Sequence, residues 1–463
     1  MKKTILIIGS GPAGLMAGLE ALNSGFNIII IEKNSFPGGK ASSNKYGDYT
    51  VDYGPHVFHP STTTLKNLMV KYSNGKEFQP KIQQSLYVED LPMDYPFRIS
   101  QAITHLKFKT NIKIFIDYFY VKVKSIFFIL PKNNFKEFGI ANFGNTLYQI
   151  CFGKYSERVW GCSAENISIE FARRKLPSLS LRALLIDSLF KKKKSHTSYH
   201  DSGFLYHENG IGTVFQNIAD DLRSRGVQFI YNSTINEFIF DGNKITGLIV
   251  NDSEISLDYL LTTMPLGDLV SLMAISHSLF TKYSGAMQYR NSIFVNVILN
   301  RPQFSQFNWS FLVNERFIFN RVSEQKNLYP TFAPKNKTLI TLEKVCKYSD
   351  PEWLRDASMW RPYVEKELSF FDISVSEIGE IFIDKLEKSY PFMYVGYESK
   401  KVDCLADLSN FNNLITTGRY GLSIDTDMHD SMQLGREALH YLINCKVPDF
   451  YLQHEQICKI RAD

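Results

Sequence analysis

The sequence predicts an α/β protein in which a doubly wound, three-layer domain carries an inserted domain of mixed helices and antiparallel sheet. Three observations support this fold class. A β-branched run at residues 4–8, typical of a strand buried on both faces, leads through a glycine-rich turn into an apolar helical stretch at 15–22. Residues 235–249 and 289–300 alternate between apolar and polar side chains, as antiparallel strands do. The length of 463 residues allows two or three domains.

The composition excludes several classes of protein. Lys+Arg 52 against Asp+Glu 47 gives a net charge of +5, well short of the concentrated basic face of a nucleic-acid-binding protein, so we expect no nucleic-acid partner. The six cysteines are scattered without a CxxC pair, which argues against a disulfide framework or a zinc ribbon and predicts a cytoplasmic location. Aromatic residues make up 14% of the chain, which indicates a large core or a stacking surface.

The most apolar long segment, residues 112–130, is interrupted by Lys113, Asp117, Lys122 and Lys124. It lacks the roughly 18 nearly uncharged residues that a transmembrane helix needs, so we expect no stable membrane insertion. Two interpretations remain. The segment is either a packed helix with snorkelling lysines, which we favour, or an amphipathic basic helix that touches a membrane.

The glycine pattern at residues 9–14 directly follows the first predicted strand. Gly9 permits a tight turn, Gly11 lets the backbone approach a pyrophosphate, and Gly14 lets the helix pack closely on the strand. The helix N-terminus then presents free N–H groups to the phosphates. The second predicted strand ends in Glu32, an acidic residue at about the distance from the motif at which a carboxylate accepts ribose hydroxyls. These features predict a Rossmann-like dinucleotide-binding domain.

A Gly-Gly turn followed by a basic residue, at 38–40, selects the dinucleotide. It resembles the FAD-binding signature shared by monoamine oxidases, protoporphyrinogen oxidases and UDP-galactopyranose mutases, in which this loop runs beside the flavin pyrophosphate and ribityl chain. The resemblance implies FAD as the cofactor. The expected contacts in this region are Gly9, Gly11, Pro12, Ala13, Gly14, Glu32, Lys33, Gly38, Gly39 and Lys40.

The motif at residues 52–59 resembles the glycine-proline-histidine-aromatic-histidine stretch of UDP-galactopyranose mutases, which lies at the flavin ring. Oxidases of the group keep the Gly-Pro but usually lack the paired histidines. The resemblance therefore places Gly54, Pro55, His56 and His59 beside the flavin. We expect no metal here, because the two histidines have no cysteine or third histidine nearby and Gly-Pro disfavours a helix.

Further stretches resemble segments of the mutases that bind the nucleotide sugar. Residues 152–161 are similar to a Tyr-Thr-x-Lys-x-Trp-Gly segment, and Arg174, or Arg173 if the register shifts by one, stands at an Arg-x-Pro. Arg321 matches a second pyrophosphate-binding arginine, with a surface ion pair to Glu324 as the alternative. The resemblance implies substrate contacts from Phe152, Tyr155, Trp160, Arg174, Phe319, Arg321, Tyr390 and Tyr420.

Near the end of the chain, Gly418 and Arg419 close a predicted strand, and Asp427 with Met428 opens a long helix. This arrangement resembles the C-terminal flavin motif of the mutases, in which a helix N-terminus stabilises negative charge on the flavin. The resemblance makes all four residues cofactor contacts. One departure matters: Asp425 stands where the mutases carry a tyrosine that helps hold the substrate pyrophosphate, and a carboxylate there would repel it unless it faces elsewhere.

Two enzyme classes fit these motifs. The resemblance favours a mutase that interconverts pyranose and furanose forms of a nucleotide-linked hexose or deoxyhexose for surface polysaccharide synthesis, through a covalent adduct of the sugar with N5 of reduced FAD. Its catalytic residues would be His56, His59, Arg174, Arg321 and Asp427. The alternative is an FAD-dependent oxidoreductase of the amine oxidase or protoporphyrinogen oxidase type. The sequence shows no second GxGxxG motif for NAD(P)H, so a mutase would need an external reductant, and a homodimer is compatible with the sequence.

The order of the motifs predicts how the chain is divided. A discontinuous FAD-binding domain comprises residues 1–70, 200–265 and 398–463. Residues 71–199 form a helical insertion of the substrate domain, and residues 266–397 form an antiparallel-sheet insertion. Such interleaving places the ligand at the junction, outside the ends of the strands.

Overall fold

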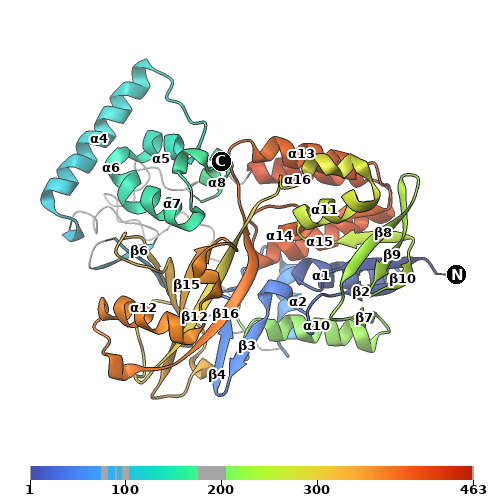
Figure 1. The fold of residues 1–463 in the computed structure, drawn as a ribbon, viewed down its shortest axis with the longest axis horizontal. Helices are drawn as coiled ribbons and strands as arrows, with labels where there is room; N and C mark the ends of the chain where they lie inside the picture. Colours follow the sequence, from blue (N-terminus) through green and yellow to red (C-terminus); the bar gives the residue numbers. More distant parts are fainter. Residues whose placement is uncertain (1, 75–81, 89–90, 96–103, 176–204, 461–463) are drawn as a thin grey trace.

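The computed structural model describes residues 2–74, 82–88, 91–95, 104–175 and 205–460. Two parts lie side by side in Figure 1. A layered α/β part contains α1, α10 and α15, and the other part consists of a large sheet with α12 on one side and the group α4–α8 at one end.

A five-stranded parallel sheet forms the centre of the layered part, with the strand order β17-β11-β1-β2-β7. Its strands come from the beginning, the middle and the end of the chain: β1 (Thr4–Ile8), β2 (Asn27–Ile31), β7 (Gln228–Ile230), β11 (Tyr259–Thr262) and β17 (Leu414–Thr416). Ile5, Leu6 and Ile7 of β1 have no exposed surface, because the strand is covered on both faces. The predicted α/β class with a Rossmann-like parallel sheet is therefore confirmed.

Helices and a small antiparallel sheet cover the parallel sheet and share its hydrophobic core. Helix α1 (Pro12–Asn23) packs so closely on α15 (Met428–Ile443) that a Cβ on Gly435 would lie 2.0 Å from the Ala13 carbonyl oxygen. A glycine is needed at that crossing. The other elements of this part are α2 (Thr63–Tyr72), α10 (Gly212–Ser224), α11 (Leu266–Ser276), α13 (Tyr397–Leu408), α14 (Gly418–Gly421), α16 (Val447–Ile460), β8 (Ile235–Asp241), β9 (Lys244–Val250) and β10 (Ser253–Ser256).

A seven-stranded sheet with the order β16-β12-β15-β14-β13-β5-β6 forms the base of the second part. Its strands are β5 (Gln84–Tyr87), β6 (Pro92–Tyr95), β12 (Tyr289–Leu299), β13 (Trp309–Leu312), β14 (Arg321–Glu324), β15 (Thr338–Cys346) and β16 (Ile378–Pro391). Helix α12 (Ala357–Ser369) packs on this sheet through Trp360. Two short strands, β3 (Ser43–Tyr46) and β4 (Tyr49–Asp52), pair with each other beside it.

The segment expected to be a helical insertion contributes strands as well as helices. Strand β5 pairs with β13 in parallel and β6 pairs with β5, so residues 84–87 and 92–95 belong to the antiparallel-sheet part rather than to a helical unit. Among its described residues, the segment contains the helices α4 (Phe108–Phe127), α5 (Phe135–Phe143), α6 (Asn145–Tyr148), α7 (Lys154–Trp160) and α8 (Ile169–Lys175), with a π-helical turn at Gln149–Gly153. The exact domain boundaries stay a prediction.

Helix α4 differs from the packed helix that we favoured. Val121 is its one fully buried residue, and the side turned away from the molecule exposes large apolar side chains. The packed-helix interpretation is therefore wrong for the outer face. Among the described residues, no helix combines the length and the apolar character needed to cross a membrane.

Candidate functional site

The loop between β1 and α1 forms a cradle of backbone atoms. Gly9 has φ +97°, a conformation that favours glycine, and a Cβ on Gly14 would lie 1.9 Å from the Gly9 carbonyl oxygen. A Cβ on Gly11 would instead meet little, because the nearest atom is the Gly38 carbonyl oxygen at 4.0 Å. Helix α1 begins here with Pro12 in its first turn, so its unpaired N–H groups face this open space.

The Gly-Gly turn closes one side of the cradle. The Gly38 N–H donates to the Ser10 carbonyl oxygen at 2.9 Å, and a Cβ on Gly39 would lie 3.3 Å from the Gly11 Cα. Glu32 is buried beside the loop and accepts hydrogen bonds from the Ser10 N–H at 2.9 Å and the Ser10 hydroxyl at 2.8 Å. The carboxylate is thus held where the second strand ends. Lys33 next to it is exposed.

His56 and Arg321 come together through Gly54. Gly54 has φ +82°, and a Cβ there would lie 2.8 Å from Nη2 of Arg321. Burial, with the nearby guanidinium groups of Arg321 and Arg419, lowers the pKa of His56 to about 4. The Nδ1 atom of His56 is buried and has no hydrogen-bond partner among the described residues. The imidazole is therefore neutral near pH 7 and has one ring nitrogen to offer a ligand.

Glu343 on β15 is the centre of a buried polar group. Its Oε2 atom pairs with Nη2 of Arg321 at 2.5 Å, and its Oε1 atom accepts from the Tyr390 hydroxyl at 2.9 Å. Burial alone would lower the pKa of Arg321, but the Glu343 carboxylate raises it above its usual value. Tyr155 lies in the same group, and burial raises the pKa of its hydroxyl, which stays a proton donor. The alternative partner, Glu324, instead accepts hydrogen bonds from backbone N–H groups elsewhere.

A second arginine near His56, Arg419, is also paired with a carboxylate. Nη1 of Arg419 lies 2.7 Å from Oδ1 of Asp425 and also donates to the Thr426 carbonyl oxygen at 2.7 Å. The Arg419 guanidinium lies 5.6 Å from the centre of the Tyr390 ring, which connects it to the Glu343 group. Asp425, the departure from the mutase pattern, therefore points toward an arginine.

Lys40 reaches from the Gly-Gly turn to strand β16. Its Nζ atom lies 3.7 Å from the centre of the Tyr420 ring and donates to the carbonyl oxygens of Glu387, at 2.8 Å, and Lys388. Burial first, and then the nearby charge of Arg419, holds the pKa of Lys40 well below its usual range. The lysine joins the dinucleotide loop to the inserted part.

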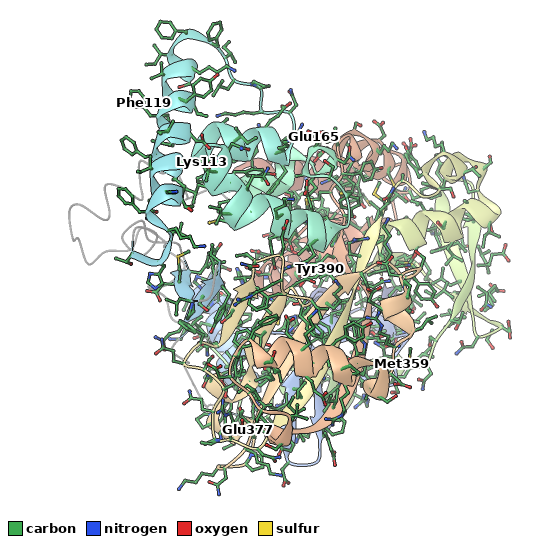
Figure 2. The ribbon with its side chains drawn as sticks, turned by 60° about the vertical axis from the view of Figure 1, so that its left-hand side comes forward. Lys113, Phe119, Glu165, Met359, Glu377 and Tyr390 are labelled. Atoms are coloured by element: carbon green, nitrogen blue, oxygen red, sulfur yellow. The ribbon has the colours of Figure 1, made fainter. Side chains whose placement is uncertain are left out.

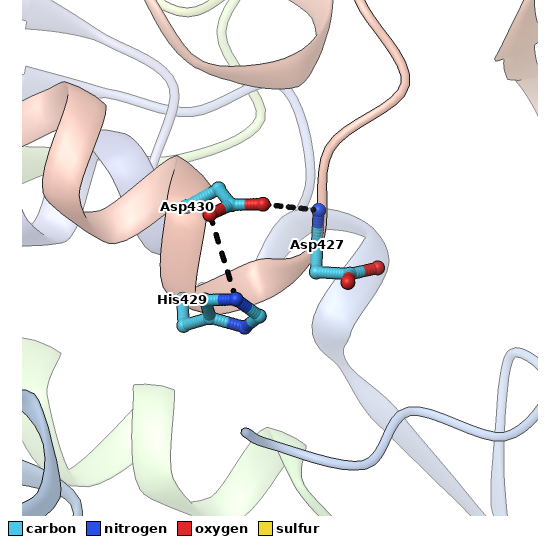
Figure 3. Close-up of side chains that lie close together, drawn as sticks. All are labelled: Asp427, His429 and Asp430. Atoms are coloured by element: carbon cyan, nitrogen blue, oxygen red, sulfur yellow. Dashed lines mark hydrogen bonds and ion pairs between the residues drawn. The ribbon is translucent and has the colours of Figure 1, made fainter. Parts of the chain in front are cut away.

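The start of α15 carries Asp427, His429 and Asp430 (Figure 3). Each offers one ligand atom within 4.8 Å of the others. The Asp427 N–H donates to Asp430 at 3.3 Å, and His429 Nε2 lies 3.4 Å from Asp430, so the carboxylates are explained by helix capping. We assign no metal to them. His59 stands next to this group, with its ring centre 5.6 Å from that of His429.

Two predicted substrate contacts, Phe319 and Trp160, are buried in hydrophobic clusters, and a third, Phe152, is half-buried against one. Phe319 has no exposed surface and packs on Trp360, with ring centres 5.3 Å apart, so the prediction of a substrate contact is wrong for this residue. Trp160 is buried and stacks on Phe392, and Phe152 packs on Phe143 in the same cluster.

Other predicted residues are placed as follows. Arg174 is in α8, but its side chain lies outside the described residues. Gly418 packs against helix α1, because a Cβ there would lie 2.9 Å from the Ala13 Cβ.

Glu343 was not among the predicted site residues. Only the register of β14 against β15, and no local motif, could have identified it.

The residues present fit a flavin dinucleotide. The glycine loop leaves open space at Gly11 in front of the N-terminus of α1, which suits a pyrophosphate. Glu32 is held at the end of β2 beside this loop, and the buried Nδ1 of His56 has no hydrogen-bond partner among the described residues.

Comparisons with known proteins agree with this geometry. Residues 7–72 match a family model described as an NAD(P)-binding Rossmann-like domain. The chain is 23% identical over 372 residues to dTDP-fucopyranose mutase from Escherichia coli, covering 78% of this chain and 88% of that protein. It is 23% identical over 196 residues to a probable UDP-galactopyranose mutase from Klebsiella pneumoniae, covering 41% of this chain and 48% of that protein. The chain thus spans about half the length of the second relative.

The solved structures extend the likeness to the whole chain. A reduced UDP-galactopyranose mutase superposes with a TM-score of 0.83 at 18% identity, covering 96% of both chains. A putative protoporphyrinogen oxidase from Exiguobacterium sp. superposes with a TM-score of 0.74 at 15% identity, covering 96% of this chain and 99% of that chain. The chain therefore has the same overall fold as these two proteins.

Proposed function

We propose that this chain is a flavin-dependent mutase that interconverts the pyranose and furanose forms of a nucleotide-linked hexose or deoxyhexose. One observation carries the proposal: two acid-paired arginines, Arg321 and Arg419, both lie near a neutral His56 in a chain whose glycine loop suits a dinucleotide. Planar guanidinium groups bind phosphate oxygens in a bidentate manner, as a nucleotide diphosphate requires. The likeness to mutases of UDP-galactopyranose and dTDP-fucopyranose supports the same class of substrate.

The residues of the chain would divide the work as follows. Arg321 holds the pyrophosphate of the nucleotide sugar, and the Glu343 carboxylate fixes its guanidinium in one orientation. Arg419, which the sequence placed among the cofactor contacts, is proposed to hold this pyrophosphate as well. His56 stays neutral at pH 7, so it orients the reacting groups through Nδ1 without adding charge. When bound, a reduced flavin supplies a nucleophilic nitrogen for covalent catalysis at the anomeric carbon. In this proposal the enzyme depends on an external reductant and serves surface polysaccharide synthesis in the cytoplasm.

An activity assay with reduced flavin tests the proposal. The purified protein is loaded with FAD, reduced with dithionite and incubated with a panel of nucleotide-linked hexoses and deoxyhexoses, and the products are separated by chromatography. We expect one of them to be converted between ring forms by the reduced protein and not by the oxidised protein. If none is converted and none perturbs the flavin spectrum, the mutase proposal is wrong. Bleaching of the oxidised flavin by an amine or a porphyrinogen would instead support an oxidoreductase.

The substitution Arg321→Ala tests the pyrophosphate role. Loss of a charge-assisted hydrogen bond of ~1.5–3 kcal/mol should raise the dissociation constant of the converted nucleotide sugar by roughly ten- to a hundredfold. Arg361→Ala is the matched control, because Arg361 lies on α12 and pairs with Glu365 at the surface. Unchanged binding by a folded Arg321→Ala variant would remove Arg321 from the site.

A further inference from the structure

Helix α4 stands at the edge of the molecule, and Figures 1 and 2 show that no other described helix or strand covers its outer side. Phe108, Phe115, Phe119 and Ile126 are 79%, 70%, 62% and 76% exposed. Spacings of seven, eleven and eighteen residues return to nearly one direction at about 3.6 residues per turn, so these side chains form one line. Further exposed apolar residues widen it into a face: Ile112, Ile116, Tyr120, Val123 and Phe127.

The opposite side of α4 is attached to the body. Val121 is buried, and Ile114 and Tyr118 pack against the cluster formed with α5 and α6. The Asp117 carboxylate accepts hydrogen bonds from the backbone N–H and the hydroxyl of Thr146, at 2.9 and 2.5 Å. The apolar outer face is therefore presented by a fixed helix, and contiguous exposed apolar surface of this kind marks an interaction site.

The charge around this face has one sign. Residues 104–132 contain six lysines: Lys107, Lys109, Lys113, Lys122, Lys124 and Lys132. All six are exposed, whereas the single carboxylate of the stretch, that of Asp117, faces Thr146 on the inner side. Phe128 and Ile129, 65% and 100% exposed, extend the apolar face beyond the end of the helix. A row of large apolar side chains with lysines on its flanks is the pattern of a helix that lies in a membrane interface.

We propose that α4 docks this protein on a membrane surface that contains anionic phospholipids, lying in the interface plane without crossing the bilayer. Charge complementarity decides the occupant. Each lysine gains from a negative surface, and the aromatic and aliphatic side chains enter the region between headgroups and acyl chains. A second copy of this chain is a poorer occupant, because two α4 faces would bring their lysines together without an exposed carboxylate from either helix. This proposal does not depend on the proposed enzymatic function.

Vesicle flotation tests the proposal with the full FAD-loaded chain. Phosphatidylcholine vesicles with 30% phosphatidylglycerol are compared with pure phosphatidylcholine vesicles. We expect the protein to float with the anionic vesicles and to be released at 0.5 M salt, because screening weakens the lysine contribution. The Phe119→Trp variant should show a blue shift of its emission with the anionic vesicles alone.

Three variants separate the contributions. Phe115→Glu with Phe119→Glu should lower the vesicle partition coefficient by on the order of a hundredfold. Lys113→Gln with Lys124→Gln should lower it by roughly fivefold for each lysine. Leu354→Glu is the matched control, because Leu354 is 79% exposed outside α4 and should leave binding unchanged. All three should keep the flavin spectrum of the unmodified protein, since these side chains lie at the surface.

Two outcomes would overturn the proposal. The first is equal flotation of the unmodified protein and the Phe115→Glu/Phe119→Glu variant. The second is no binding to anionic vesicles together with a dimer, measured by light scattering, that the same variant dissociates. That result would make a second copy of this chain the occupant of α4.

Discussion

The substitution Glu343→Gln tests whether the buried arginine pair is organised as the structure indicates. Glu343 is 5% exposed at its side chain and Arg321 is 18% exposed, and their atoms lie 2.5 Å apart. Glutamine keeps the shape and one acceptor for the Tyr390 hydroxyl, but it removes the charge that balances the guanidinium. Arg321 is then left as a nearly buried charge without a compensating carboxylate. Removing one partner of a buried ion pair in this way strongly lowers the free energy of unfolding.

The expected loss in the free energy of unfolding is ~3 kcal/mol, at the lower end of the range for breaking a buried ion pair because the amide still accepts a hydrogen bond. Arg321→Met added to Glu343→Gln should recover part of this loss, because no charge is then buried. The coupling energy of the double-mutant cycle should be about 2 kcal/mol. The surface pair Arg361 and Glu365, whose side chains are 41% and 30% exposed, is the control cycle and should give under ~0.5 kcal/mol.

Urea unfolding followed by tryptophan fluorescence is the suitable assay. All four tryptophans, Trp160, Trp309, Trp353 and Trp360, lie in the part of the chain that contains β14 and β15, so their emission reports on that part. Measurements at one fixed FAD concentration keep the contribution of ligand binding constant. A coupling energy below ~0.5 kcal/mol would refute the inference that Glu343 neutralises Arg321.

Two further substitutions test neighbouring features. Gly54→Ala should lower the free energy of unfolding by ~1–3 kcal/mol in the same assay, because it combines φ +82° with a Cβ 2.8 Å from Arg321 Nη2. Gly47→Ala, at φ +56° in open space, is the control and should lower it by less. Equal losses in the two variants would contradict the close approach of Arg321 to Gly54. His56 has a folded-state pKa of about 4, below the usual 6.5, so the unfolded chain binds more protons between these values and stability should fall by up to ~3 kcal/mol as pH drops from 6.5 to 4. His56→Asn should remove this slope and exposed His440→Asn should keep it; if His56→Asn leaves the pH dependence unchanged, His56 is not buried as described.

How much the sequence predicted depended on the range of the interaction. The dinucleotide loop could be predicted from the sequence, because Gly9, Gly11 and Gly14 act within one strand-turn-helix unit. The role of Glu343 could not be predicted from the sequence, because its pairing with Arg321 depends on the register of β14 against β15 across 22 residues of chain. Nothing local distinguishes the register that opposes these two residues from one shifted along the strands.

The second limit on prediction from the sequence was that it does not show which apolar side chains are buried. Phe319 lies two residues before Arg321 in the stretch that resembles a substrate-binding segment, yet its ring packs on α12 and only the arginine reaches the polar group. Helix α4 shows the converse, because a period of 3.6 identifies an apolar face but does not say whether a neighbour covers it. The strands β5 and β6, four residues each, were too short to stand out within a segment dominated by helices.

The expected effect of Asp425 on a bound pyrophosphate changes once its partner in the structure is known. As a replacement for a tyrosine it suggested repulsion of a pyrophosphate, but its carboxylate neutralises Arg419 in the same way that Glu343 neutralises Arg321. Both arginines are therefore held in place by acids, and neither presents a full unbalanced charge to a ligand. A pyrophosphate would share each guanidinium with a carboxylate rather than displace it, since a displaced buried carboxylate would lose its partner at several kcal/mol. The proposed site thus favours orientation of the phosphates over tight binding, which suits an enzyme that must hold a leaving nucleotide and take it back.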